Sequence, residues 1–399
     1  MTSAGARILV LNAGSSTLKA AILEVGAGMD PGDASIELPV VATSTRRWAD
    51  DEDVPATLQR ALAEVGATDP EALTGIGHRV VHGGPDLFAP ARVDAGLIGA
   101  LEALVPLAPL HLPPAIATIG AMSSLAPDAP QVACFDTAFH AGLPEVDRTY
   151  PVPVEWRALL GLRRFGFHGL SVDWAVRRAA VLLGRPVAAL GLVVAHLGAG
   201  ASVTAVEGGR SVHTSMGYTP LEGLVMATRS GSLDPGIVTA MARAGHAADD
   251  LEADLQQRSG LSALAGTGDM REILALVAAG DAGARLALDV FVDRAAAAIA
   301  AAATRLRRLD ALVFTGGIGE ASPVVRGAVA ARLGVLGVAP LEDGAPAVEH
   351  DRVLGAGSGA GASAGRGARR DAGPVVLRVA AREDRIIAAA VRDLTTIQR

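Results

Sequence analysis

The chain has 399 residues, of which 50% are hydrophobic and 19% are charged, so it is long enough for two globular domains with separate cores. Its formal net charge of −7 argues against a nucleic-acid-binding protein or one that lies on a membrane surface. A single cysteine, Cys134, excludes an internal disulfide, and the first residues do not read as a signal peptide. We therefore expect a cytoplasmic protein whose partners include neither nucleic acid nor membrane.

The first predicted elements form a hairpin. Residues 7–12 have the apolar pattern of a strand, and residues 17–25 alternate well enough to be its partner. The tip between them is not a Walker A loop, because it holds one glycine and leads into a strand rather than a helix. Gly14 still allows close backbone approach, residues 15–17 offer hydroxyl groups, and Lys19 offers a positive charge. The tip is therefore either a phosphate-binding turn or an ordinary polar turn.

Strands and helices alternate along the rest of the chain, a pattern typical of α/β proteins. Short apolar runs bounded by glycine or polar residues indicate strands, and longer runs indicate helices. A glycine turn is expected directly after the last strand. We predict strands within residues 75–84, 131–140, 190–198 and 310–320, a hairpin over residues 201–212, and helices over residues 55–66, 174–184 and 285–309.

One pattern occurs twice along the chain. Residues 7–23 and residues 192–209 both read as strand, small-residue turn and strand. Either two short hairpins agree by chance, or the chain contains two domains of similar build. Residues 354–373 are rich in Gly, Ala and Ser, which predicts a flexible surface insertion without chemistry.

Two further glycine-rich turns follow predicted strands, at His196–Gly200 and Gly316–Glu320. Each is a weak signal by itself, because glycine turns after strands are common. Together with the hairpin tip they make three such turns, each at a strand end. That combination favours a nucleotide site.

Arginine, histidine and aspartate side chains mark candidate catalytic positions. Arg79 lies inside an apolar strand, and Arg229 lies in a loop rich in Gly, Ser and Asp. Each either forms a structural ion pair or neutralises the oxygens of a phosphate or carboxylate ligand. His168, near two glycines, offers a hydrogen-bond donor for an oxyanion, and Asp136 ends an apolar strand. The other histidines show no metal-binding spacing.

These motifs, in this order, resemble the acetate and propionate kinase family over nearly the whole chain. The long central block is the most specific part of the match. The resemblance rests on LNAGSSTLK, GHRVVHGG, LAPLHLPP, FDTAFH, FGFHG, HLGAGASVTAVEGGRSVHTSMGYTPLEGLVMATRSGSLDP, FTGGIGE and RED.

The resemblance implies an α/β fold of two RNase H-like domains, as in the actin, sugar kinase and heat-shock ATPase superfamily, with a nucleotide cleft between them and a homodimeric assembly. We expect a first domain over residues 1–150, with residues 385–399 packing back on it, and a second, nucleotide-binding domain over residues 151–384. The implied reaction is reversible transfer of the γ-phosphoryl group of ATP to acetate, with Mg²⁺ or Mn²⁺ as the metal. The hairpin tip would then be the phosphate-binding hairpin of this superfamily.

The resemblance also implies roles for individual residues. Asn12 and Glu383 are expected to hold Mg²⁺, and Lys19 to lie near the nucleotide phosphates. Arg79 and Arg229 are expected to bind acetate and the phosphoryl group in transfer. The remaining expected residues are His168 for transition-state charge, Asp136 as the catalytic carboxylate, Val81, Leu110, Phe167 and Pro220 around the acetate methyl group, and His196, Leu197, Gly198, Ala199, Gly200, Asp269, Met270, Arg271, Gly317, Ile318, Gly319, Glu320 and Ala321 around ATP.

The sequence departs from the family pattern mainly on the nucleotide side. Ala199 and Ala321 replace asparagines, Met270 replaces an aromatic residue, and Thr17 replaces a serine. Because two amide side chains are lost, the sequence predicts weaker or less selective binding of ATP rather than a different reaction.

The chemistry of the implied acceptor needs no general base. A small carboxylic acid, with a pKa of about 4–5, is already ionised at neutral pH. Catalysis is then positioning and charge neutralisation, so we expect Asp136 to orient an arginine or the metal shell. Two alternatives remain open: a kinase of the same fold that acts on propionate or butyrate, and a non-catalytic, nucleotide-dependent switch.

Overall fold

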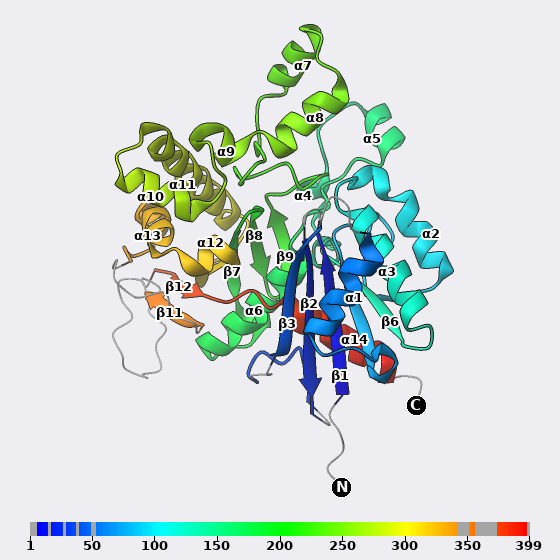
Figure 1. Cartoon of the computed structure of the whole chain (residues 1–399). Helices are drawn as coiled ribbons and strands as arrows, with labels where there is room; N and C mark the ends of the chain where they lie inside the picture. The colour runs from blue at the N-terminus through cyan, green and yellow to red at the C-terminus, as the bar shows by residue number, and fades with distance from the viewer. Residues whose placement is uncertain are drawn as a thin grey trace. The chain divides into compact units, whose positions relative to one another are not determined.

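A computed structural model of the chain contains two compact units, each with its own six-stranded sheet (Figure 1). Unit 1 comprises Met1–Ala141, Phe167–Arg177 and Arg382–Arg399, and unit 2 comprises Gly142–Gly166 and Arg178–Ala381. The structure describes residues 6–14, 17–26, 29–36, 40–48, 53–341, 351–355 and 373–396.

The sheet of unit 1 is mixed. In sheet order its strands are β3 (Val40–Arg47), β2 (Thr17–Val25), β1 (Ala6–Ala13), β4 (Gly75–Val80), β6 (Gln131–Phe135) and β5 (Ala91–Arg92). The predicted N-terminal hairpin is confirmed, because β1 and β2 pair antiparallel from Ala6 opposite Val25 to Ala13 opposite Leu18. β4 lies parallel to both β1 and β6, so the carboxyl ends of these three strands meet at one edge of the sheet.

Helices pack on both faces of this sheet. The helices of unit 1 are α1 (Val54–Glu64), α2 (Ala95–Ala103), α3 (Leu112–Leu125), the first part of α6 (Gly169–Leu183) and α14 (Glu383–Thr396). Ile76 of β4 faces a buried cluster that includes Leu58 of α1 and Met122 of α3. Because neighbouring strand residues point to opposite faces, Gly77 faces the other side, where a Cβ would overlap Ile387 of α14. Glycine in β4 therefore lets α14 lie directly against the strand that carries Arg79.

The sheet of unit 2 repeats the same order. Its strands are β9 (Arg210–Thr214), β8 (Ala201–Glu207), β7 (Gly191–Leu197), β10 (Ala311–Thr315), β12 (Val375–Arg378) and β11 (Arg352–Gly355). β7, β8 and β9 form an antiparallel meander, and β10 lies parallel to β7 and β12. The prediction of two α/β domains of similar build, each opening with a hairpin, is confirmed.

The longest helix of unit 2 is the Ala-rich α11 (Ala282–Ala303), which the sequence predicts. Its buried side includes Leu288, Phe291 and Ile299, and it packs on β7, β8 and three neighbouring helices. Among the described residues, no helix combines the length and the apolar character that a membrane span requires. The other helices are α4 (Glu145–Arg148), α5 (Val154–Leu160), α7 (Pro235–Arg243), α8 (Ala248–Gln257), α9 (Gly260–Ala265), α10 (Met270–Ala278), α12 (Gly316–Ala321) and α13 (Pro323–Ala331).

Two local predictions differ from the structure. The segment after β10 was expected to be a glycine turn, but only Gly316, with φ 78°, turns the chain, and Gly316–Ala321 forms the short helix α12. The Gly/Ala-rich segment was expected to begin at residue 354, but Leu354 and Gly355 belong to β11 and pair with β12. Residues 356–372 of that segment, and Ser15 and Ser16 of the hairpin tip, lie outside the described residues.

The units also differ from the expected domain bounds. Residues 142–150 belong to unit 2, whereas Phe167–Arg177 belongs to unit 1. The backbone N–H of Gly169 donates to the carbonyl of Asp136 at 2.9 Å, which ties this segment to the end of β6. Residues 382–384 belong to unit 1, because α14 begins at Glu383 and packs on the unit 1 sheet.

Candidate active site

The carboxyl ends of the parallel strands in unit 1 carry a cluster of charged and polar side chains around Arg79. The strand register places Arg79 of β4 beside Asn12 of β1. The Arg79 guanidinium donates through Nε to Asp136 Oδ1 at 3.0 Å and through Nη2 to Asp136 Oδ2. Its Nη1 donates to Asn12 Oδ1 at 3.1 Å, and Glu383 Oε2 lies 3.4 Å from Nε. Three residues that the sequence assigns to catalysis and metal binding thus meet on the guanidinium of a fourth.

Burial shapes the electrostatics of this cluster. Asp136 is 1% exposed, and burial raises the pKa of its carboxyl to about 6, although Arg79 opposes the rise. Burial also disfavours the charge on Arg79, but the carboxylates of Asp136 and Glu383 outweigh this and raise its pKa. At neutral pH the Arg79 cation is therefore paired with the buried Asp136 carboxylate. The ion pair that one interpretation of Arg79 requires is present, and Asp136 makes the contact with an arginine that its expected role requires.

His168 lies next to this cluster in an unusual backbone conformation. Among the described residues other than glycine, it alone has a positive φ, 58°. Its backbone N–H donates to the Asp136 carboxylate, and His140 Nε2 contacts the carbonyl of Phe167 at 2.9 Å. A Cβ at Gly169 would overlap the backbone of Asp136, so only glycine fits there. Such strain persists where the surroundings fix the backbone, and it is common at functional sites.

The residues predicted to surround the acetate methyl group divide between the units. Val81 is 6% exposed, and Phe167 is buried with its ring against His82, at 5.4 Å between ring centres. Leu110 is more exposed and lies between α2 and α3. These three residues belong to unit 1, whereas Pro220 belongs to unit 2.

The hairpin tip places Lys19 opposite Asn12. The two residues are direct partners across β1 and β2, so their side chains share one face of the hairpin. Lys19 is exposed. The turn closes through the backbone N–H of Gly14, which donates to the carbonyl of Thr17 at 2.8 Å, and Trp48 Nε1 donates to the carbonyl of Gly14 at 2.8 Å. Lys19 therefore extends from β2, near the strand ends that these two hydrogen bonds join.

In unit 2 the two predicted glycine-rich turns lie side by side. Thr315 at the end of β10 pairs with His196 near the end of β7. A Cβ at Gly316 would lie 2.8 Å from the carbonyl oxygen of Leu197, so the backbones approach too closely for a side chain. The N–H of Gly198 donates to the carbonyl of Gly200 at 3.0 Å and closes the hairpin tip. Backbone rather than side chains therefore lines this pair of strand ends.

A buried arginine that the sequence reasoning missed supports α12. Arg326, on α13, is 3% exposed and donates through Nη1 to the carbonyls of Gly319 and Glu320 at 2.8 and 2.7 Å. Arg378 Nε donates to the same carbonyl of Glu320 at 3.2 Å. The Glu320 carboxylate accepts a hydrogen bond from the backbone N–H of Ala381 at 2.9 Å, so one of its oxygens is already paired within the protein. The sequence signal for this role of Arg326 is its position in the helix that directly follows the glycine-rich segment.

The third segment that the sequence assigns to the nucleotide lies at the N-terminus of α10. Asp269 caps that helix by accepting from the N–H of Arg271 at 2.9 Å, and Arg271 lowers the pKa of Asp269 to about 2. Met270 is buried, whereas the Arg271 side chain is 89% exposed. The N–H of Ala227 donates to the carbonyl of Ala199 at 3.1 Å, which joins the β7–β8 tip to the segment that carries Arg229.

The oxygen donors of unit 1 fit a hard metal ion. Asn12 and Glu383 bring an amide oxygen and a carboxylate oxygen to the same Arg79 guanidinium, at Nη1 and Nε respectively. Within the described part of the chain, no group of three or more His, Cys, Asp or Glu residues forms a metal cage. Mg²⁺ suits such a sparse set, because it usually keeps several waters and binds one or two side chains together with substrate phosphates.

Comparisons with known proteins agree with this geometry. The model of the acetokinase family matches residues 7–345. A curated relative from Deinococcus deserti, named acetate kinase, is 48% identical over 343 residues, which cover 82% of this chain and 86% of the relative. A solved structure of a propionate kinase from Francisella tularensis has a TM-score of 0.79 and 32% identity, over 96% of this chain and 98% of that one. An acetate kinase structure from Porphyromonas gingivalis has a TM-score of 0.81 and 28% identity, over 99% and 100%. The extent of the family match and the identity to the curated relative show that this chain belongs to the acetokinase family.

Proposed function

We propose that this chain is a kinase that transfers the γ-phosphoryl group of ATP to acetate, reversibly, to give acetyl phosphate and ADP. The observation that carries the proposal is the buried Arg79 cluster in a member of the acetokinase family. A guanidinium held by Asp136 and set at the ends of parallel strands suits the planar, two-oxygen geometry of a carboxylate or phosphoryl ligand.

The proposed step needs charge neutralisation rather than proton transfer. An acetate oxygen attacks Pγ, and the bond from Pγ to the β–γ bridging oxygen breaks, so ADP leaves with the electron pair. Arg79 and Arg229 neutralise the carboxylate and phosphoryl oxygens, and His168 donates to the charge that develops in the transition state. Asp136 keeps the Arg79 guanidinium in one plane and removes no proton, since acetate is already ionised.

Asn12 and Glu383 would hold Mg²⁺, and the same oxygen donors suit Mn²⁺. When bound, the metal neutralises negative charge on the phosphoryl oxygens. The nucleotide would lie along Lys19, His196–Gly200, Asp269–Arg271 and Gly317–Ala321. The close approach of Gly316 to Leu197 supports this placement, because bare backbone lets phosphate or ribose come near.

The acceptor pocket would be small and apolar. Val81, Leu110, Phe167 and Pro220 would surround the acetate methyl group, and the burial of Val81 and Phe167 supports a snug fit. We also infer a cytoplasmic homodimer with small molecules as its partners, without nucleic acid or membrane. The net charge of −7 and the single, buried cysteine support the compartment and the partners, and the family supports the dimer.

A hydroxamate assay tests the proposed reaction. The full chain is incubated with ATP, Mg²⁺ and acetate, and hydroxylamine traps any acyl phosphate. We expect hydroxamate only when all three are present, and ATP formation from ADP and acetyl phosphate in reverse. Nucleotide binding without hydroxamate would favour the non-catalytic switch. Parallel assays with propionate and butyrate give the ratio of kcat/KM values, and a higher value for propionate would change the proposed acceptor.

A further inference from the structure

The segment that carries Pro220 and Arg229 has no secondary structure of its own. After β9 ends at Thr214, residues 215–234 form neither helix nor strand before α7 begins at Pro235. A long irregular segment holds a functional geometry only where other groups fix it. The side chains that fix this one therefore decide where Pro220 and Arg229 lie.

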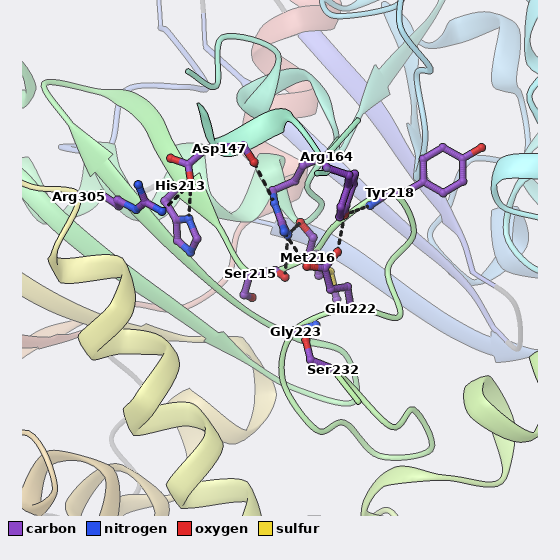
Figure 2. A network of polar contacts seen from close by, with 11 residues as sticks. Asp147, Arg164, His213, Ser215, Met216, Tyr218, Glu222, Gly223, Ser232 and Arg305 are labelled. Carbon is purple, nitrogen blue, oxygen red and sulfur yellow. Dashed lines mark hydrogen bonds and ion pairs between the residues drawn. The ribbon is translucent and has the colours of Figure 1, made fainter. Parts of the chain in front are cut away.

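Arg164 is the centre of the network that fixes the start of this segment (Figure 2). Its Nη1 donates to the carbonyls of Ser215 and Met216 at 3.1 and 3.0 Å, and its Nη2 donates to Glu222 Oε1 at 2.6 Å. Its Nε donates to the carbonyl of Asp147 at 3.3 Å. All of its nitrogens therefore bind the chain, and its side chain is 14% exposed. Such a residue positions backbone and is not a site for a ligand.

Asp147 connects this network to the sheet. Its carboxylate contacts His213 Nδ1 of β9 at 2.9 Å and Arg305 Nη2 at 3.4 Å (Figure 2). The side chain of Asp147 is 5% exposed. The network around Arg164 is thus attached to rigid elements of unit 2.

Tyr150 closes a short turn around Pro220. Its hydroxyl donates to Glu222 Oε2 and accepts from the backbone N–H of Tyr218 at 2.9 Å. One oxygen therefore joins both ends of Tyr218–Glu222, with Pro220 in the middle. A Cβ at Gly217 would overlap both Glu222 and the Tyr150 hydroxyl, so the contact leaves no room for a side chain there.

The Tyr218–Glu222 turn also contacts Arg229. Arg229 Nη1 donates to the carbonyl of Pro220 at 3.3 Å. Directly after Glu222, the N–H of Gly223 donates to Ser232 Oγ at 3.1 Å, and the N–H of Ser232 donates to the carbonyl of Gly223 at 2.9 Å (Figure 2). The part of the segment that carries Arg229 is therefore closed on the same turn.

We propose that Arg164, Glu222 and Tyr150 form a positioning unit for the acceptor side of the site: they fix the Tyr218–Glu222 turn, and through the Pro220 carbonyl they orient Arg229 toward the carboxylate substrate. The inference rests on the proposed acetate kinase reaction, and it assigns these three residues to acceptor binding and transfer rather than to nucleotide binding. Among the described residues, the hydrogen bonds of these three side chains join them to one another and to Asp147, Ser215, Met216 and Tyr218, and not to the segments expected to line the nucleotide.

The two tyrosines of the chain offer a matched test. Tyr150→Phe removes the hydroxyl that closes the turn, whereas Tyr218→Phe keeps the backbone N–H, which is the only part of Tyr218 that the positioning unit uses. We expect Tyr150→Phe to lower kcat/KM for acetate by about tenfold, with KM for ATP within about twofold of wild type. Tyr218→Phe is expected to stay within about twofold for both substrates.

A double-mutant cycle tests whether the three side chains act together. Arg164 and Tyr150 hold the two oxygens of Glu222, so Arg164→Lys and Tyr150→Phe should be non-additive in log(kcat/KM) for acetate. Glu222→Gln, which keeps one acceptor oxygen, should retain more activity than Glu222→Ala. Equal kinetics for Tyr150→Phe and Tyr218→Phe would overturn the inference. So would equal losses for acetate and ATP together with a lower melting temperature, since that pattern indicates a structural role alone. A wild-type chain that forms no hydroxamate would instead overturn the proposed function, and the inference with it.

Discussion

The two units share one strand order but differ in what lies at equivalent strand ends. In unit 1, β1, β4 and β6 end near Asn12, Arg79 and Asp136, which are polar or charged and in mutual contact. In unit 2, the equivalent β7 and β10 are followed directly by Gly198 and Gly316, and the backbones approach closely at Gly316. One sheet topology therefore supports two kinds of strand end: one carries charged and polar side chains, and the other brings two backbone segments close together.

This difference predicts unequal tolerance to substitution. A side-chain site depends on the identity of each residue, because a change of charge or of bidentate hydrogen-bonding geometry leaves a partner without its hydrogen bond. A backbone site tolerates changes of side chain as long as the glycines that permit the close approach remain. At these strand ends, substitutions in unit 1 should therefore lower turnover, whereas substitutions in unit 2 should change the affinity for the nucleotide.

The largest expected effect is a loss of unit 1 stability in acid. His78 and His140 are both buried in unit 1, and burial lowers the pKa of each to about 4. In the unfolded chain a histidine titrates near 6.5, so the unfolded state binds more protons between these values. The free energy of unfolding of unit 1 is therefore unaffected by these histidines above pH 6.5. It falls as the pH falls toward 4, by ~3 kcal/mol for each histidine. Asp136, with its raised pKa, opposes part of this loss below pH 6.

Tryptophan fluorescence can measure this in unit 1 alone. Of the three tryptophans, Trp48 and Trp174 belong to unit 1, so Trp156→Phe removes the only one in unit 2. We expect the urea concentration at the unfolding midpoint of this variant to be lower at about pH 5 than at about pH 7. The decrease should be smaller when His78→Gln and His140→Gln are added. An unchanged midpoint over this pH range would contradict the prediction.

The next effect compares one arginine from each unit. Arg79→Lys loses the planar pairing with Asp136, so turnover should fall about 100-fold. Arg326→Lys should cost less than tenfold, because one ammonium can reach both carbonyls that Arg326 Nη1 binds. Steady-state rates and melting curves check both variants. If Arg79→Lys melts far below wild type but keeps its turnover per folded molecule, the ion pair is structural only.

A smaller effect is expected from restoring the missing amides of unit 2. Ala199 and Ala321 are both exposed, so asparagine fits at either position without displacing the core. Ala199→Asn with Ala321→Asn should lower KM for ATP by about tenfold and leave KM for acetate unchanged, since each new hydrogen bond contributes about 0.5–1.5 kcal/mol. Initial rates at varied ATP measure this. No change in either KM would mean that neither position contacts the nucleotide.

The smallest effect concerns the acceptor pocket. Val81→Ala enlarges a site where Val81 is now buried, so the preference for acetate over propionate should narrow by about threefold. The ratio of the two kcat/KM values, measured in the same preparation, is independent of the amount of folded enzyme. A ratio equal to that of wild type would exclude contact between Val81 and the substrate methyl group.

The sequence predicted the repeated hairpins and the parallel strands, because alternating apolar residues and glycine punctuation are local signals. It did not predict that Phe167–Arg177 returns to unit 1, since such contacts join residues far apart in the chain, whereas the family resemblance did imply that residues 385–399 pack back on the first domain. It was wrong about α12, where tertiary contacts such as those of Arg326 stabilise a helix that starts with two glycines.

For the candidate site, motifs identified the residues with distinctive chemistry, and the structure brings Asn12, Arg79, Asp136 and Glu383 together. Motifs could not identify Arg164, which acts by binding backbone carbonyls. Carbonyls are present at every position, so a residue that binds them leaves no pattern in the sequence. Residues that position the backbone around a site are therefore harder to predict from sequence than the residues of the site itself.

The contact between Gly77 of β4 and Ile387 of α14 also determines when unit 1 can finish folding during synthesis. β4 leaves the ribosome roughly 300 residues before α14, which at about 5–20 residues per second is a delay on the order of 15–60 s. All of unit 2 is translated within that interval. Unit 1 therefore waits with one face of its sheet uncovered, and unit 2, although it begins later in the chain, can complete its fold first. A nascent chain stalled before residue 383 should accordingly present the face of β4 to chaperones.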